Sequence, residues 1–259
     1  MKPRLNILKI GGNLIENEGQ LMPFLKGIAA LHGPKIIVHG GGKKASSVLE
    51  QLDITPVMTQ GRRVTDAATL EVVTMVYGGL VNKNLVAKLQ ALGVNALGMS
   101  GADANSIMAH KRPVKEVDYG FAGDVDRVNA PMLNTILTAG LTPVFCALTH
   151  DGQGQLLNTN ADTIAAELAI GLSEYFDVVL NYCFELNGVL RTMDDPDSVI
   201  PKIDSDSYES LKAAGIFADG MLPKLHNCFQ ALQRGVSEVR IGNLGLFKNE
   251  HTSYTSLVL

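Results

Sequence analysis

Two glycine clusters follow short apolar runs near the start of the chain, in a pattern that could bind an anion. Gly11–Gly12 follows the run Leu5–Ile10, and Gly40–Gly42 follows Lys35–His39. Glycine lets backbone N–H groups approach a phosphate or carboxylate closely, and a helix start after it adds the positive end of the helix dipole. Either cluster alone could be a plain strand-to-helix turn. Two of them predict an anion-binding edge of a parallel sheet, because ligands collect where strands end.

Two lysines could supply positive charge to a transferring phosphoryl group. Lys9 lies at the end of the first apolar run, although a lysine there could also extend its ammonium group past the sheet edge into water. Lys224 opens a late helical pattern, where the helix dipole disfavours a cation. A bound polyanion would account for both positions. The chemistry that they predict is phosphoryl transfer.

A second group of polar residues could bind a small acid. Arg63 lies in a turn-rich stretch, and an arginine there could grip a carboxylate through two parallel hydrogen bonds or simply be solvated. Asn158 and Asn160 are two residues apart, so on an extended segment their amides point the same way. Asn160 also suits the N-cap of the next helix, with Asp162 in its first turn. Capping leaves Asn158 unexplained.

A serine hydrolase is the alternative from another class. Neither glycine cluster has P-loop or dinucleotide-binding spacing. However, His39–Gly42 matches the oxyanion loop of many esterases, and Gly98–Ala102 is one residue short of a nucleophile elbow with Ser100 as nucleophile. The residues after Ser100 are polar and turn-like, where an elbow should begin a helix. That argues against the hydrolase.

Strand and helix patterns alternate along the chain, which predicts an α/β fold with a largely parallel sheet covered on both faces. The predicted strands are Leu5–Ile10, Lys35–His39, Val94–Met99, Thr142–Ala147, Asp177–Cys183 and Glu238–Ile241. The predicted helices are Leu21–Leu31, Lys43–Leu52, Asp66–Leu92, Ala130–Ala139, Ala161–Ile170, Tyr208–Ala214 and Gly220–Gly235. Pro56–Arg63 and Ser106–Val128 are predicted hairpins or lids, and a soft boundary falls near Gly171–Ser173.

Composition limits the partners. The 259 residues are 46% hydrophobic and 19% charged, with a net charge of −4, so no general field attracts nucleic acid or an anionic membrane. The sequence shows neither a membrane span nor a signal peptide. Cys146, Cys183 and Cys228 form no C-x-x-C pair and indicate reduced, mostly buried thiols. We therefore expect a cytoplasmic protein.

Taken together, these motifs resemble the amino acid kinase family in order and spacing, from about Leu5 to the C-terminus. The resemblance implies a three-layer αβα sandwich, with an acyl-amino-acid lobe over residues 1–172 and an ATP lobe over residues 173–259. It also implies ATP-dependent phosphorylation of the γ-carboxylate of an N-acylated L-glutamate, N-acetyl by default, in arginine biosynthesis. An N-succinyl substrate would need room for the larger acyl group or a cation near it, which Lys43, Lys44 or Arg62 could supply. A non-catalytic nucleotide-binding sensor is a further alternative.

The resemblance assigns a role to each candidate residue. Gly41, Gly42, Arg63 and Asn158 would hold the acylglutamate, with Asn160 nearby. Lys9 and Lys224 would stabilise the phosphoryl group, aided by Gly11 and Gly12, and Asp162 would position both lysines. The nucleotide would lie against Glu185, Leu186, Asn187, Gly188, Val189, Leu190, Ile216, Phe217 and Ala218. We expect Mg²⁺ to be carried mainly by the nucleotide, without a dedicated protein metal site.

Three departures from the family pattern bear on these expectations. Glu185 stands where related kinases usually carry aspartate, which puts details of the nucleotide contact in doubt. Tyr254-Thr255 replaces a common Gly-Thr pair and weakens the assignment of a last strand. The chain begins almost directly with its first strand, as in feedback-insensitive, dimeric members. The helix Asp66–Leu92 is then the expected homodimer surface, or alternatively a buried helix.

Overall fold

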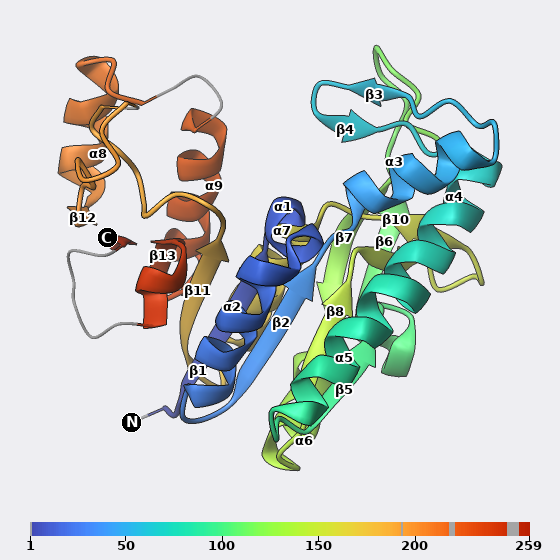
Figure 1. The fold of residues 1–259 in the computed structure, drawn as a ribbon, viewed down its shortest axis with the longest axis horizontal. Helices are drawn as coiled ribbons and strands as arrows, with labels where there is room; N and C mark the ends of the chain where they lie inside the picture. The colour runs from blue at the N-terminus through green and yellow to red at the C-terminus, as the bar shows by residue number, and fades with distance from the viewer. Residues whose placement is uncertain (1, 193, 218–220, 248–253) are drawn as a thin grey trace.

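An eight-stranded sheet forms the centre of the computed structural model, which describes residues 2–192, 194–217, 221–247 and 254–259 (Figure 1). Across the sheet the strands are β12 (Lys202–Ile203), β14 (Thr255–Leu257), β13 (Glu238–Gly242), β11 (Asp177–Cys183), β1 (Arg4–Ile10), β2 (Lys35–His39), β8 (Thr142–Cys146) and β5 (Ala96–Met99). All neighbours pair in parallel except β13 and β14. The prediction of a largely parallel sheet is confirmed.

Helices cover both faces of this sheet, which makes the three layers that were expected (Figure 1). One face carries α6 (Ala130–Thr138), α7 (Ala161–Leu172) and α9 (Leu222–Gln233), and the other carries α1 (Gly12–Glu16), α2 (Glu18–Ala30), α3 (Gly42–Gln51), α4 (Ala67–Val73) and α5 (Asn82–Ala91). The remaining helix, α8 (Ser205–Ala213), lies beside β12.

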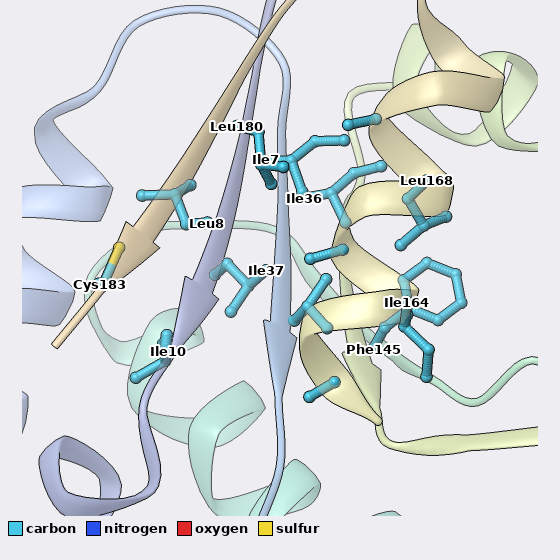
Figure 2. Packing of buried hydrophobic residues seen from close by; sticks show 14 of the residues in the cluster. Ile7, Leu8, Ile10, Ile36, Ile37, Phe145, Ile164, Leu168, Leu180 and Cys183 are labelled. Carbon is cyan, nitrogen blue, oxygen red and sulfur yellow. The ribbon is translucent and has the colours of Figure 1, made fainter. Parts of the chain in front are cut away.

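The core lies between the central strands and α7 (Figure 2). Ile7, Ile36 and Phe145 face Ile164 and Leu168 of this helix, and all five side chains are fully buried. Strands buried on both faces read as continuous apolar runs. That composition is why β1, β2 and β11 are so clear in the sequence, and why their ends, which carry Lys9 and the glycines, are held firmly in place.

A smaller four-stranded sheet, which we call the lid sheet, stands off the main one. Its order is β10 (Leu156–Asn158), β9 (Leu148–His150), β6 (Ile107–Lys111) and β7 (Gly123–Val128). A separate hairpin pairs β3 (Met58–Thr59) with β4 (Arg62–Arg63), and Gln60 and Gly61 turn it with positive φ. Both turn-rich stretches therefore form hairpins as predicted.

The predicted helix Asp66–Leu92 is helical throughout but not uniformly α. Between α4 and α5 lies the π-helix η1 (Thr74–Val81). The wider turn of a π-helix rotates the side chains that follow, and such segments occur often at functional sites. Three short strands were not predicted, β9, β10 and β12, and the last strand, β14, was expected only from the family pattern. Each is two or three residues long, too short to show a period in the sequence.

The cysteines and the apolar segments were the subject of two expectations from composition. Cys146, Cys183 and Cys228 are all buried and unbonded, as predicted. Burial raises the pKa of the Cys146 and Cys228 thiols to about 12, so neither is an activated thiolate at neutral pH. Among the described residues, no helix has both the length and the apolar character needed to cross a bilayer.

Candidate active site

Two cavities lie at the ends of the central parallel strands. The first, which we call the arginine cavity, has a volume of about 220 Å³. It contains three arginine side chains and the second glycine cluster. Its lining residues are Gly40, Gly41, Gly42, Met58, Gly61, Arg62, Arg63, Tyr77, Arg112, Ala122, Gly123, Ala147, Asn158, Thr159, Asn160 and Ala161.

Arg63 is the buried cation of the arginine cavity. Only 9% of the residue is exposed. Its Nη2 donates to the carbonyl of Gly42 and to Ser46 Oγ, both at 2.8 Å. Its Nη1 is buried and has no hydrogen-bond partner among the described residues. Leaving a buried charged donor unpaired is costly. An incoming carboxylate would satisfy it.

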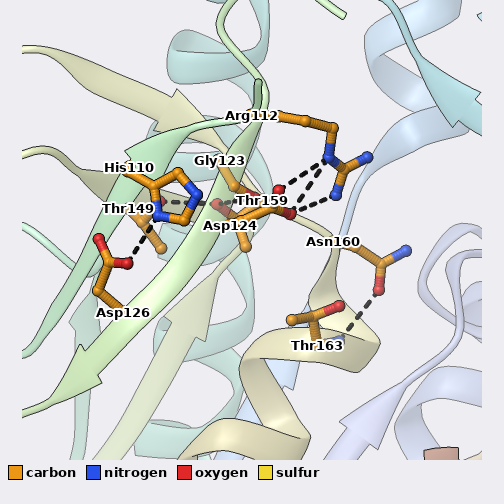
Figure 3. A network of polar contacts seen from close by, with 9 residues as sticks. All are labelled: His110, Arg112, Gly123, Asp124, Asp126, Thr149, Thr159, Asn160 and Thr163. Carbon is orange, nitrogen blue, oxygen red and sulfur yellow. Dashed lines mark hydrogen bonds and ion pairs between the residues drawn. The ribbon is translucent and has the colours of Figure 1, made fainter. Parts of the chain in front are cut away.

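The two asparagines reach the arginine cavity from a segment that is held in place by threonines. Asn158 donates from Nδ2 to Thr65 Oγ1 at 2.9 Å. Thr159 makes a hydroxyl–hydroxyl bond of 2.7 Å with Thr149 (Figure 3). Asn160 caps α7, and its Oδ1 accepts from the backbone N–H of Asp162 and Thr163. The amide nitrogen of Asn160 remains as a donor beside the cavity.

The second cavity, which we call the lysine cavity, has a volume of about 120 Å³. Lys9 from β1 and Lys224 from α9 both line it, so the structure brings together two residues that are 215 positions apart (224 − 9). Lys9 Nζ lies 2.8 Å from Asp162 Oδ1. The other residues that line the lysine cavity are Arg62, Asn160, Asp162, Thr163, Tyr182, Phe184, Met221, Asn227, Cys228 and Ile241.

Lys224 is held differently from Lys9. Its ammonium group lies over the ring of Phe184, 5.6 Å from the centroid. Within the described part of the chain, the ion pair of Asp162 is with Lys9, and none within 4.0 Å joins it to Lys224. Asp162 was expected to position both lysines, and the structure shows a direct ion pair with Lys9. An exposed ammonium group on an aromatic face remains available to a polyanion.

The two cavities share part of their walls. Arg62 and Asn160 line both of them. A ligand that is anchored by Arg63 could therefore extend past Asn160 and present its far end to Lys9 and Lys224. This arrangement joins a cavity that holds the unpaired, buried Nη1 of Arg63 to a cavity lined by two lysines.

Other predicted residues line neither of the two cavities. The N–H of Gly11 donates to the carbonyl of Cys183 at 2.9 Å, so the phosphate donor expected from this pair would be Gly12. Gly188, Val189 and Leu190 are buried in the C-terminal region, and the N–H of Val189 donates to Thr255 Oγ1. The predicted nucleotide residue Ala218 lies outside the described residues.

Of the other predicted nucleotide residues, Glu185, Leu186 and Asn187 follow β11 closely, whereas Ile216 and Phe217 come after α8. The carbonyl of Glu185 accepts from Asn243 Nδ2, and its side chain is exposed. Asn187 accepts from the same amide at 2.7 Å. Leu186 and Ile216 are half-buried, and Phe217 stacks on Tyr208. Glu185, Leu186 and Asn187 start next to Phe184, which lines the lysine cavity, so their predicted contact with a nucleotide is compatible with the chain path.

A buried histidine supports the second glycine cluster from beneath. His39 is fully buried at the end of β2. The Gly40 carbonyl can only accept, so His39 Nδ1 carries the hydrogen and donates to it at 2.7 Å. His39 Nε2 then accepts from Asn82 Nδ2 at 3.0 Å, and the same amide donates to the Val144 carbonyl. Burial lowers the pKa of His39 from 6.5 to about 4.

This low pKa predicts a loss of stability in acid. Below pH 6.5 the unfolded chain binds a proton at His39, whereas the folded chain stays neutral until about pH 4, so the free energy of unfolding falls between these values. The loss attributable to His39 should reach about 3 kcal/mol. Urea unfolding at pH 7.5, 5.5 and 4.5 measures it. His39→Gln should remove this part of the loss, whereas His32→Gln, on the surface, should retain it. Parallel pH curves for wild type and His39→Gln would contradict the assignment.

The serine hydrolase alternative is wrong on geometry. Ser100 forms a local turn in which both its N–H and its hydroxyl donate to Asp103 Oδ2. A short 3-10 turn, η2 (Asp103–Asn105), and then β6 follow it, so no helix begins there. The supposed oxyanion loop instead lines the arginine cavity.

Comparisons with known proteins agree with the kinase reading. A family model described as the amino acid kinase family matches residues 4–243. The chain belongs to the amino acid kinase family. The acetylglutamate kinase of Bacteroides fragilis is 56% identical over 93% of this chain and 92% of that protein. The acetylglutamate kinase of Methanopyrus kandleri is 39% identical over 96% of this chain and 99% of that protein.

Solved structures agree at the level of the fold. The Streptococcus mutans protein smu.665 has a TM-score of 0.77 and 26% identity, and the match covers 98% of both chains. The carbamate kinase of Giardia lamblia, solved with AMP-PNP, has a TM-score of 0.66 at 13% identity and covers 99% of this chain and 98% of that one. At that identity the likeness concerns the fold alone.

Within the amino acid kinase fold, the departure at Tyr254 does not prevent the last strand. β14 begins at Thr255 and pairs with β13 and β12. The Tyr254 ring instead packs under Arg240, whose guanidinium carbon lies 5.0 Å from the ring centroid. A larger residue than glycine is therefore accommodated here by a cation–π contact.

Arg112, Tyr77 and Phe184 are among the lining residues that had no assigned role in the sequence analysis. Arg112 forms a bidentate pair with Asp124, through Nε at 3.1 and 3.2 Å and through Nη2 (Figure 3). Tyr77 and Phe184 had apolar, core-like contexts, and nothing in their spacing marks them as cavity residues. Among the described residues, no cluster of three or more His, Cys, Asp or Glu could hold a metal ion.

Proposed function

We propose that this chain transfers the γ-phosphoryl group of ATP to the γ-carboxylate of N-acetyl-L-glutamate and forms an acyl phosphate, as a step of arginine biosynthesis. The observation that supports this proposal most strongly is the pair of adjoining cavities. One contains the unpaired Nη1 of buried Arg63, and the other is lined by Lys9 and Lys224. The similarity to acetylglutamate kinases across nearly the whole chain supports the same substrate.

In this mechanism the substrate needs no general base. A γ-carboxyl group has a pKa of about 4.3, so it is ionised at neutral pH. Its oxygen attacks the γ-phosphorus of ATP while the bond to the bridging oxygen breaks, and ADP leaves with the electron pair. Two anions must meet, so catalysis depends on positioning and on positive charge at the phosphoryl oxygens. Lys9 and Lys224 supply that charge, and Asp162 orients Lys9 through its 2.8 Å ion pair.

The remaining predicted residues fit this division of work. Arg63 would bind the α-carboxylate, and the N–H groups at the start of α3, at Gly41 and Gly42, face no side-chain cap of their own. Asn158 and Asn160 would hold the amide portion between the cavities. Mg²⁺ bound to the nucleotide would neutralise the β- and γ-phosphates. Asp162 is the carboxylate that lines the lysine cavity, and its ion pair with Lys9 leaves it little capacity as a metal ligand.

A second candidate is the same transfer to N-succinyl-L-glutamate. The favouring observation is Arg62, which lines both cavities and is exposed. No ion pair within 4.0 Å engages it in the part of the chain that the structure describes. Lys43 and Lys44, the other cations considered, instead line a separate cavity beside Glu16 and Lys88. A succinyl carboxylate would therefore depend on Arg62.

An assay of ADP release with N-acetylglutamate, N-succinylglutamate and unmodified glutamate tests the proposal. We expect turnover of the N-acetyl compound to exceed that of unmodified glutamate by at least tenfold in kcat/KM. A preference for the N-succinyl compound that Arg62→Ala abolishes would establish the second candidate. Equal, background-level release with all three would contradict both and favour the nucleotide-binding sensor.

We also propose a homodimer whose contact surface is α4–η1–α5. Met75 and Leu80 of η1 are 57% and 46% exposed, and a dimer contact through this segment would remove both apolar side chains from water. Light scattering should give about twice the monomer mass for the wild type and the monomer mass for the double variant Met75→Glu/Leu80→Glu. The control Val114→Glu changes an exposed apolar residue in the connection between β6 and β7 and should remain dimeric. A monomeric wild type would refute the proposal.

The lobes and the cellular location remain part of this proposal. An acyl-amino-acid lobe over residues 1–172 contains the arginine cavity, and an ATP lobe over residues 173–259 supplies Lys224. Free, buried cysteines and the use of ATP support a cytoplasmic location.

A further inference from the structure

The π-helix η1 contacts the second glycine cluster through Tyr77, and the residue after η1 bonds to the residue before the cluster. Tyr77 lies in the middle of η1, and its ring lies directly against the backbone of Gly41: a Cβ added there would be 2.8 Å from Tyr77 Cδ1. Asn82, the first residue after η1, bonds to His39, which precedes the cluster. The wider π turn therefore decides which side chains reach this loop.

Tyr77 also lines the arginine cavity, although only 5% of the residue is exposed. Its hydroxyl lies 3.9 Å from the position of a Cβ on Gly42, and the Arg63 Nη2 lies at the same distance from that position. The phenol is therefore close to both groups to which the proposed function assigns substrate binding. Burial raises the pKa of Tyr77, with the charge of Arg63 acting in the other direction. The hydroxyl is thus protonated at neutral pH and able to donate.

The position of Tyr77 relative to the two cavities indicates which end of a ligand it would meet. Arg62 and Asn160 line both cavities, whereas Tyr77 lines only the arginine cavity. With the reacting carboxylate directed at Lys9 and Lys224, the opposite end of the molecule lies beside Tyr77. In an N-acylated amino acid, that end carries the α-carboxylate and the acyl amide, and both accept hydrogen bonds.

We propose that Tyr77 is a specificity-determining residue, whose ring fixes the Gly41 backbone and whose hydroxyl donates a hydrogen bond to the acyl amide carbonyl of the substrate. This inference rests on the proposed function, since it assigns a partner within the same site. It separates two roles of one side chain. The ring is structural, and the hydroxyl discriminates between acylated and unmodified glutamate.

Tyr77→Phe tests the hydroxyl, because the variant retains the ring against Gly41. The KM for the acylglutamate that the wild type prefers should rise about tenfold, the typical worth of one hydrogen bond. The KM for ATP and kcat should stay within twofold, and the rate with unmodified glutamate should not change. Tyr175→Phe, which removes a phenol hydroxyl at the far end of β11, is the matched control and should behave as wild type. Tyr77→Leu, which also removes the ring, should in addition lower the melting temperature.

The outcomes separate the two proposals. A wild type that phosphorylates an acylglutamate, with an unchanged acylglutamate KM in Tyr77→Phe, would overturn the role of Tyr77 and leave the proposed function standing. Equal rises in both KM values together with a lower melting temperature would also overturn it, because they indicate a purely structural residue. A wild type without acylglutamate kinase activity would overturn the proposed function, and this inference with it.

Discussion

Replacing Lys9 by methionine is expected to lower kcat by about 10²–10³, which is the typical loss when one preorganised donor to a transition-state charge is removed. Methionine keeps much of the length of the side chain but not its charge. Lys9 is only 19% exposed and lies 2.8 Å from Asp162, so its ammonium group is fixed before the nucleotide arrives. In the proposed mechanism, that fixed position would make it effective in the transition state. Lys224→Met should cause a loss of the same order, because it removes the second cation of the lysine cavity.

Steady-state kinetics with saturating ATP and acylglutamate measure these losses. Lys26→Met, an exposed lysine on α2, controls for the change in net charge and should keep the wild-type kcat. Lys9→Met leaves Asp162 without its partner, so melting curves must show that the variant is folded. Asp162→Asn provides a second test: it keeps both lysines but removes the 2.8 Å restraint, and should lower kcat less than Lys9→Met does. Near-normal turnover in folded Lys9→Met would refute the catalytic role.

The elements that carry the lysines and glycines could be predicted because burial on both faces leaves a clear pattern. Lys35–His39 and Asp177–Cys183 have the predicted bounds, and the other four long strands differ by one or two residues at an end. In a parallel sheet the ends of such strands must meet, so Lys9 and Gly40–Gly42 could be placed at one edge without coordinates. Lys224 could be singled out because the helix dipole disfavours a cation at the start of a helix. In each case a local rule and the global fold agree.

The walls of the arginine cavity could not be predicted in the same way. Tyr77 and Arg112 reach it through η1 and the lid sheet, and neither element has a strong signal of its own. Each backbone hydrogen bond of a π-helix reaches one residue further than in an α-helix, a change too small for the apolar pattern of Asp66–Leu92 to reveal. β9 and β10 are three residues each and are held by pairing across the lid rather than by periodicity. Tertiary contacts decide such segments.

Arg63→Ala is expected to raise the KM for acylglutamate by about 10²-fold or more while the KM for ATP stays within about twofold. A hydrogen bond to a charged group contributes about 1.5–3 kcal/mol, and a guanidinium that binds a carboxylate with two such bonds loses both. The buried Nη1 without a partner is the donor that a substrate carboxylate would satisfy. The variant also frees the Gly42 carbonyl and Ser46, which Nη2 holds at 2.8 Å. Some loss of order in the glycine loop is therefore part of the effect.

Two further variants divide the Arg63 effect into its parts. Ser46→Ala removes one of the two bonds that hold Nη2 and should raise the acylglutamate KM only a few fold, because the guanidinium remains. Arg63→Lys keeps the charge without the planar fork, so its KM should lie between wild type and Arg63→Ala. Arg127→Ala, an exposed arginine of β7, should match wild type. If Arg63→Ala raised the KM for ATP and left that for acylglutamate unchanged, the arginine cavity would be the nucleotide site, and the direction of transfer between the two cavities would have to be reversed.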